Sequence, residues 1–205
     1  MHPKVLSPEA WETVRAVANG GWLDSWVLAG GTGLALQLGH RYSDDLDLFR
    51  IEPFDPLALA EALSRIGRVG VQSRSADTLH VTVKGLRLSY LRVEAPLLFD
   101  GVAYRGLTVA DARDIAVMKV VAIGGRGSRK DFVDLFFFLR SGGTLEGVFS
   151  LLRQRFQGVD HNTYHLLKSL VYFADAEEEP MPKMIRPVDW ETVKAALVTE
   201  VRRLS

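Results

Sequence analysis

The hydrophobic period changes once along the chain, and this change limits the folds that the sequence can adopt. Before residue 106, helical stripes are interleaved with apolar or alternating stretches typical of strands, for example 79–83 and 86–90. After residue 106, only helical spacing remains. We therefore expect an α+β fold, with a mixed sheet and flanking helices in residues 1–105 and a helical region in residues 106–205.

Capping residues mark where several helices are expected to begin. Ser7-Pro8 and Asp55-Pro56 each combine a side chain that can cap a helix with a proline suited to its first turn. Thr32 is expected to cap a helix that ends at Gly39, and Thr108-x-x-Asp111 has the form of a capping box. Further helices are expected over residues 128–139, 144–156, 161–175 and 189–204.

Composition excludes several kinds of chemistry. The 205 residues include no cysteine, so disulfides, thiolate nucleophiles and cysteine-bound zinc are excluded. Basic and acidic residues number 25 each, so a nucleic-acid partner would need a local basic patch. No segment has the length and apolar character of a membrane span, and the N-terminus lacks the apolar run of a signal peptide. We therefore expect a cytoplasmic protein with no membrane partner.

Two acidic residues form a candidate metal site. Asp45 and Asp47 alternate with Leu46 and Leu48 in an expected strand, so both carboxylates would project from the same face. Adjacent carboxylates repel each other unless a cation lies between them. Mg²⁺ is commonly held by one or two carboxylates together with substrate phosphates. Asp-x-Asp alone is a weak signal, and a solvated turn is the alternative.

The turn Gly30-Gly31-Thr32 is a candidate phosphate site. It follows the apolar run 26–29, which favours a buried strand, and precedes an expected helix. Glycines let a ligand approach the backbone, and the first N–H groups of a helix point toward an anion. The alternative is an ordinary strand–helix connection. A glycine turn followed within one short helix by paired carboxylates is a narrower pattern than either feature alone.

These segments resemble the AbiEii/AbiGii toxin family of nucleotidyltransferases, within the DNA polymerase β-like superfamily. The resemblance covers about residues 25 to 140 and rests on the stretches 28–36 (LAGGTGLAL), 39–49 (GHRYSDDLDLF), 114–119 (DIAVMK) and 126–135 (RGSRKDFVDL). It implies a polymerase β-like nucleotidyltransferase core in residues 1–105. The helical region 106–205 would then complete the active-site cleft.

The family also implies a reaction. Its members are toxins of toxin–antitoxin and phage-abortive systems, and the MenT branch transfers nucleotides from NTPs to the acceptor end of tRNA. The resemblance therefore implies transfer from an NTP to an acceptor hydroxyl with Mg²⁺ or Mn²⁺, with tRNA as the expected acceptor and a cognate antitoxin as partner. The expected catalytic residues are Asp45, Asp47, Lys119 and Asp134, and the first two are also the implied metal ligands. The expected nucleotide contacts are Gly30, Gly31, Thr32 and Asp131, together with Arg126 and Lys130 from a basic cluster of the sequence.

The residues themselves leave the helical part of this site open to two interpretations. Lys119 and Asp134 each lie in an apolar stretch of consecutive expected helices, so we expect their charged ends to meet at the cleft. The pair is either structural or catalytic, and in the second case Asp134 would accept the hydroxyl proton. Arg126, Arg129 and Lys130 form a basic cluster suited to phosphate or tRNA, with a solvated loop as the alternative.

One position departs from the superfamily pattern. Polymerase β-like enzymes usually carry a third metal-binding carboxylate on a later strand, where this sequence offers Ser89, with Glu94 nearby. Two other functions stay open, and the missing acid suggests the second of them. One is a nucleotidyltransferase that modifies a small molecule, as aminoglycoside enzymes do. The other is a catalytically weakened nucleotide-binding or interaction protein.

Overall fold

The computed structural model describes residues 1–159 and 161–204, and its central feature is a mixed β-sheet. The strands of this sheet are β1 (Val27–Leu28), β2 (Asp45–Arg50), β3 (Val69–Arg74), β4 (Thr78–Val83), β5 (Leu86–Arg92), β6 (Val102–Tyr104) and β7 (Leu107–Val109). Within the described residues their spatial order is β3-β4-β5-β2-β1-β7-β6. Because β2 is antiparallel to β1 and parallel to β5, it lies in the middle of the sheet.

The strands with clear alternation were predictable. The expected hairpin is confirmed, since β4 and β5 pair antiparallel on either side of Lys84-Gly85, both with positive φ. The strand expected around residues 46–49 is confirmed as β2. By contrast, β3, β6 and β7 were not expected. β3 is largely exposed and the other two have three residues each, so none carries enough alternating apolar residues to be recognised.

Helices flank this sheet and form most of the remaining described chain. They are α1 (Pro8–Asn19), α2 (Gly30–Leu38), α3 (Pro56–Leu63), α4 (Ala112–Arg126), α5 (Arg129–Arg140), α6 (Leu145–Arg155), α7 (Thr163–Ser169), α8 (Ala174–Glu177) and α9 (Trp190–Leu204), with short 3₁₀ turns η1 (Pro3–Val5) and η2 (Ser64–Ile66). Among the described residues no single helix could cross a membrane. α5 and α6 reach that apolar length only together, across a bend of 111°.

Two of the expected helix starts are wrong. Ser7 and Asp55 cap α1 and α3 as expected. α2, however, begins two residues before Thr32, whose side chain is buried inside the helix and does not cap it. The cap of α4 is Asp111 alone, because Thr108 belongs to β7 and takes no part in a capping box. In both cases a threonine that can cap a helix is engaged by the sheet or its loops.

The expected division between residues 105 and 106 falls inside the hairpin formed by β6 and β7. β7 pairs in parallel with β1 and extends the sheet, so the helical region begins at Ala112 instead of residue 106. The physical reason is that one more strand is needed to pair the free edge of β1. The expected roles of the two regions, a nucleotidyltransferase core in the first and completion of the active-site cleft by the second, stay a prediction.

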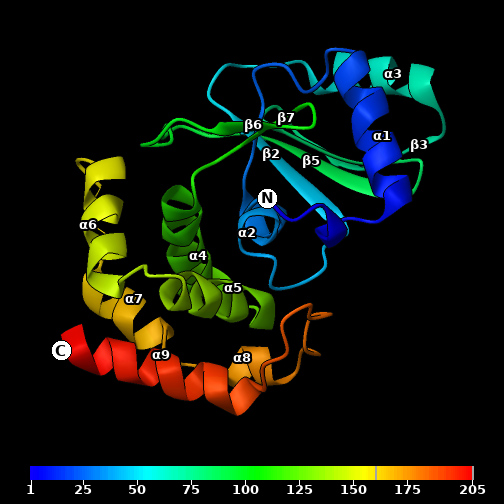
Figure 1. Cartoon of the computed structure of the whole chain (residues 1–205). Helices are drawn as coiled ribbons and strands as arrows, with labels where there is room; N and C mark the ends of the chain where they lie inside the picture. The colour runs from blue at the N-terminus through cyan, green and yellow to red at the C-terminus, as the bar shows by residue number, and fades with distance from the viewer. Residues whose placement is uncertain (160, 205) are drawn as a thin grey trace.

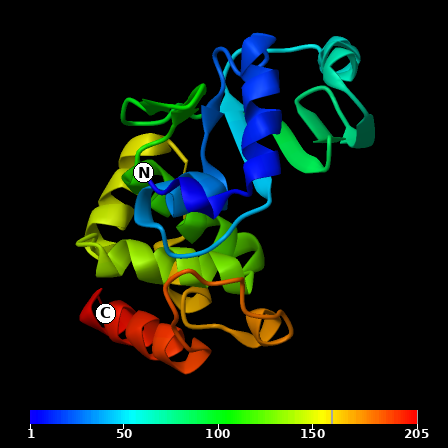
Figure 2. The ribbon, with the colours of Figure 1, turned by 45° about the vertical axis from the view of Figure 1, so that its right-hand side comes forward.

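α2 lies between two hydrophobic cores. The first core lies between the sheet and the helices α1 and α3, and it includes Leu36. The second core is formed by the six helices from α4 through α9, and it includes Leu34. Figure 1 shows α2 between the sheet and the helices below it, and Figure 2 shows the same two layers from another side. The mixed sheet with flanking helices confirms the expected fold class. In this arrangement the first residues of α2 and of β2 both lie where the sheet meets the layer of helices.

We expect Leu34→Ala and Leu36→Ala each to lower the free energy of unfolding by about 2–5 kcal/mol, because both side chains are fully buried. Because one helix contributes to both cores, each variant should still unfold in a single transition. Calorimetry and denaturant titrations followed by circular dichroism would measure both effects. Two separated transitions in either variant would contradict the idea that α2 couples the layers.

Candidate active site

The carboxylates of Asp45 and Asp47 lie on one face of β2. Burial alternates along the strand, with Leu46 and Leu48 buried and the two aspartates partly exposed, as strand geometry requires. The Asp47 carboxylate packs against the backbone of Gly30, because a Cβ at that glycine would lie 2.6 Å from Asp47 Oδ2. The structure thus brings the paired acids and the glycine turn together.

The two glycines leave room for charged side chains of the protein itself. Gly30 has φ +58°, in the left-handed region that favours glycine. At Gly31 a Cβ would collide with the guanidinium group of Arg41 and lie 3.1 Å from Asp134 Oδ2. The pair also opens the first turn of α2, whose N–H groups have no acceptor within the helix and can receive an anion.

Thr32, which was expected to contact the nucleotide, also makes hydrogen bonds within the protein. Its buried hydroxyl donates to the carbonyl oxygen of Asp45 and lies 2.7 Å from the hydroxyl of Ser43. This contact fixes the chain just before β2, and hence the direction of the Asp45 side chain. Contact between Thr32 and a triphosphate stays a prediction, for which its backbone N–H is better placed than its hydroxyl.

The neighbouring strands β4 and β5 bring three further side chains to the paired acids, namely Arg87, Ser89 and His80. The sequence alone had given none of them a role in the site. Arg87 on β5 forms an ion pair with Asp45. Ser89, directly across from Asp47, hydrogen-bonds to that carboxylate, and His80 Nδ1 on β4 lies 3.0 Å from Ser89 Oγ. Burial raises the pKa of Asp47, and the Ser89 hydrogen bond and the charge of Lys119 oppose this only in part. Strand register was the signal that could have found Ser89 and His80.

Glu94 does not join this group. It follows the end of β5, exposed, and lines a cavity that shares no residue with the surroundings of Asp45. Ser89 is therefore the residue that occupies the position expected for a third carboxylate.

On the helical side, Asp134 is the centre of a buried charge network. Its Oδ1 accepts hydrogen bonds from Arg41 Nε (2.6 Å) and His40 Nε2 (2.8 Å), and its Oδ2 accepts one from Arg41 Nη2 (2.9 Å). Lys119 Nζ lies 2.8 Å from Oδ2. We call Asp134, Lys119, Arg41 and His40, with Asp131, the Asp134 network. Lys119 and Asp134 therefore meet as expected, but the contact is buried and neither residue lines a cavity beside Asp45.

Lys119 holds two carboxylates at once. Its ammonium group lies 2.7 Å from Asp131 Oδ1 and 2.8 Å from Asp134 Oδ2, and Asp131 also accepts from the Ser128 hydroxyl. Burial alone would lower the pKa of Lys119, but the charges of Asp134 and Asp131 outweigh it and raise the pKa. An ammonium group has three N–H donors, and these two carboxylates engage two of them.

The surroundings of Asp134 do not suit the expected acceptor of a hydroxyl proton. The side chain is fully buried, and four donor groups converge on its two oxygens. Burial would raise the pKa of Asp134, but the charges of Lys119 and Arg41 hold it well below its ordinary value. Burial lowers the pKa of His40, so this ring is neutral near pH 7 and donates its Nε2–H to the carboxylate.

The expected basic cluster separates in space. Arg129 turns away from the site, donating to the carbonyl oxygens of Ala176 and Glu177, so it is structural. Arg126 is exposed and does not line the cavities beside Asp45. Lys130 is exposed and does line the larger of them, so it is the member of the cluster that the structure brings to the acids.

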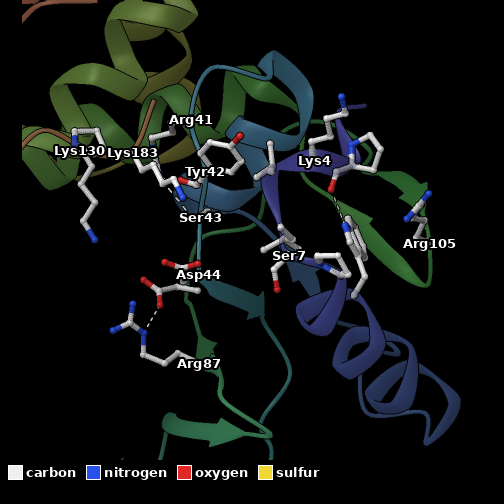
Figure 3. Close-up of a pocket in the computed structure, with 17 residues that line it drawn as sticks. Lys4, Ser7, Arg41, Tyr42, Ser43, Asp44, Arg87, Arg105, Lys130 and Lys183 are labelled. Atoms are coloured by element: carbon white, nitrogen blue, oxygen red, sulfur yellow. Dashed lines mark hydrogen bonds and ion pairs between the residues drawn. The ribbon is translucent and has the colours of Figure 1, made fainter. Parts of the chain in front are cut away.

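Two cavities meet at the pair Asp45 and Arg87. The smaller, of about 260 Å³, also contains Asp47, Ser89 and His80. The larger, of about 840 Å³, is lined by cationic side chains from separate parts of the chain, namely Lys4, Arg41, Arg87, Arg105, Lys130 and Lys183. In Figure 3, Lys4 and Arg105 lie on one side of this cavity, and Arg41, Lys130 and Lys183 on the other. The larger cavity is therefore suited to an extended anion that reaches the acids at one end.

Comparison with known proteins gives two matches that cover most of the chain. A family model described as nucleotidyl transferase AbiEii toxin, type IV TA system, matches residues 14–203. An uncharacterized protein of Aquifex aeolicus strain VF5 is 36% identical over 202 residues, which cover 96% of each chain. The family match alone spans every acid and glycine assigned above to the candidate site.

Solved structures share the fold at low identity. A candidate nucleotidyltransferase from H. pylori superposes with a TM-score of 0.61 at 17% identity, covering 95% of this chain and 92% of the other. The antibiotic-resistance factor ANT(2″)-Ia gives a TM-score of 0.53 at 19% identity, covering 76% and 96% respectively. At these identities the likeness is one of fold.

We expect Asp134→Asn to lower the free energy of unfolding by about 3–5 kcal/mol, because Lys119 and Arg41 would stay buried without their shared counter-charge. Asp131→Asn is the matched control. Its carboxylate is partly exposed and pairs with Lys119 alone, so the loss should be much smaller. Urea unfolding of both variants measures the difference. Equal losses, or a negligible loss for Asp134→Asn, would contradict the central place of Asp134.

Proposed function

The chain belongs to the AbiEii family of nucleotidyl transferase toxins and is a nucleotidyltransferase, and from this premise we propose that transfer takes place at Asp45 and Asp47. The observation that carries the proposal is the contact of the Asp47 carboxylate with Gly30 at the start of α2. Phosphate oxygens received by the first turn of that helix would lie directly beside the paired acids.

The donor groups fit Mg²⁺ or Mn²⁺ held jointly with a nucleotide. Among the described residues there is no cluster of three or more side chains arranged to bind a metal ion alone. Two carboxylates on one face fit an ion that takes its other ligands from phosphates and water. Bound there, the ion would offset negative charge on the triphosphate. Arg87, paired with Asp45 and largely exposed, is free to move from the carboxylate to a phosphate.

The residues of the chain would mainly position the reactants. The N–H groups of Gly30, Gly31 and Thr32 donate to phosphate oxygens, and Lys130 adds a positive charge from α5. An acceptor hydroxyl attacks the α-phosphorus in line, the bond to the bridging oxygen breaks, and pyrophosphate leaves. The hydroxyl proton is lost to water in the open cavity. Asp134 takes no part as a base. It positions Lys119, whose positive charge acts on Asp47.

The acceptor that best suits the larger cavity is RNA, and we infer that it is tRNA. Apart from the buried Arg41, five cationic side chains from separate parts of the chain line the cavity beside Asp45, an arrangement that favours a phosphate backbone. An aminoglycoside carries several positive charges and would be repelled by the same side chains. Because tRNA and NTPs are cytoplasmic, the reaction would take place there. We also propose a cognate antitoxin as a partner, on the strength of the toxin family.

We expect label from an α-labelled NTP to enter RNA when the protein is incubated with Mg²⁺ and total tRNA. Asp45→Asn and Asp47→Asn should each lower incorporation by at least about a hundredfold, since either change removes charge that the ion requires. Each of the four NTPs is tested in turn, and the products are separated by gel electrophoresis. Neither variant should lose stability, because the two carboxylates repel each other in the absence of metal.

The control for this experiment is Asp100→Asn, an exposed carboxylate away from both cavities, which should transfer at the wild-type rate. Full transfer by both site variants would overturn the role of the acids. Label on an aminoglycoside and none on RNA would overturn the assignment of the acceptor. Label on neither would favour the weakened nucleotide-binding protein.

The superfamily pattern includes a third carboxylate, which this chain lacks. We expect Ser89→Asp to supply it. Without metal, this variant should melt at a lower temperature, because the introduced carboxylate would lie directly across from Asp47 and repel it. Mg²⁺ should then raise the melting temperature by more than it does in the wild type, since ligand binding stabilises the folded state. Ser89→Ala is the control. An Mg²⁺ response no greater than that of Ser89→Ala would contradict the proposed metal position.

A further inference from the structure

A third cavity lies apart from the two cavities beside Asp45. It has a volume of about 840 Å³, within the range of about 300–1,000 Å³ typical of small-molecule sites. Its walls come from the loop after β5, from α4 and from the end of α6, and it shares no lining residue with the two cavities beside Asp45. Met118, Val121, Leu98 and Phe156 make much of this wall apolar.

Arg155 is the charged group built into this cavity. Its side chain is only 4% exposed, although it lies at the end of α6 on the cavity wall. Nη2 donates a long hydrogen bond of 3.4 Å to the carbonyl oxygen of Ala95. Nε and Nη1 are buried and have no hydrogen-bond partner among the described residues. A guanidinium group with two unused buried donors is costly, because buried charges ordinarily have partners.

Asp114 does not satisfy this arginine. The nearest approach is 4.0 Å, from Arg155 Nη1 to Asp114 Oδ1, which is too long for a hydrogen bond. Both oxygens of Asp114 are already used, since Oδ1 accepts the N–H of Leu98 and Oδ2 that of Phe99. Asp114 therefore holds the loop after β5 against α4, and its charge only moderates that of Arg155.

Burial lowers the pKa of Arg155, with the charge of Asp114 opposing this, which is the response of a cation short of counter-charge. Arginine remains charged at any physiological pH. Nη1 and Nη2 together form the end of its planar group, which suits the two oxygens of a carboxylate, and of these two atoms Nη1 has no partner and Nη2 has only the long bond to Ala95. Glu94, which also lines the cavity, is exposed, so water screens its repulsion of an anion.

We propose that this cavity is a binding site for a carboxylate that carries an apolar chain, with the carboxylate on Arg155 and the chain along Met118, Val121 and Phe156. A purely apolar ligand would leave the guanidinium group unpaired, and a small inorganic anion would leave the apolar wall exposed to water. Only a molecule with both parts satisfies both features. The inference does not depend on the proposed reaction at Asp45 and Asp47.

Octanoate is the probe, and octan-1-ol, which has the same chain without the charge, is its neutral counterpart. Binding is measured by calorimetry and by the rise in melting temperature with concentration. We expect saturable binding of one octanoate that is at least tenfold tighter than that of octanol. Arg155→Met should weaken octanoate by about tenfold or more, leave octanol unchanged, and not lower the melting temperature of the free protein.

Arg153→Met is the matched control, since Arg153 is an exposed arginine on the same helix that does not line the cavity. It should bind octanoate as the wild type does. Val121→Trp, which fills the cavity and keeps Arg155, should abolish binding of both probes and covers the case in which Arg155→Met does not fold. The proposal is overturned if octanoate and octanol bind equally well, if octanoate does not saturate, or if Arg153→Met weakens binding as much as Arg155→Met.

Discussion

The arrangement of the site depends on one buried carboxylate, that of Asp134. It fixes Lys119 from α4, Arg41 and His40 from the loop after α2, and its own helix α5 in a single set of contacts. The same loop is held from the other side, because the N–H of Ile185 donates to the carbonyl oxygen of His40. Since β2 begins directly after this loop, the position of the paired acids Asp45 and Asp47 is set from the helical region as well as from the sheet.

Charge is distributed differently inside and outside this network. Inside, two carboxylates face Lys119 and Arg41, with a neutral His40, so the buried part is balanced and offers little net field. Outside, the cations around the larger cavity exceed the acids beside them. A neutral net charge over the whole chain therefore conceals a local surplus at the place where a polyanion would enter.

Some of this could be predicted from sequence, and the difference has a physical cause. β2, the hairpin and the shared face of Asp45 and Asp47 follow from alternation, which is local. Arg41 and His40, which bind Asp134, are 93 and 94 residues away from it along the chain, and no period links them. Ser89 and His80 meet Asp47 only through strand register. Lys119 and Asp134 were correctly paired because each charge stood in an apolar stretch, whereas the burial of Asp134 argues against the proton-accepting role expected for it.

The close approach of Arg41 and Asp134 to the backbone of Gly31 has a consequence for genetics. A selection for harmless alleles of a toxin would recover substitutions at this glycine readily. They would be interpreted as nucleotide-contact mutants, since the glycine lies in the expected phosphate turn. Any side chain there, however, displaces the guanidinium group and with it the counter-charge of a buried acid. Such alleles would lose function through reduced protein abundance in the cell, and only purified, folded protein could distinguish the two explanations.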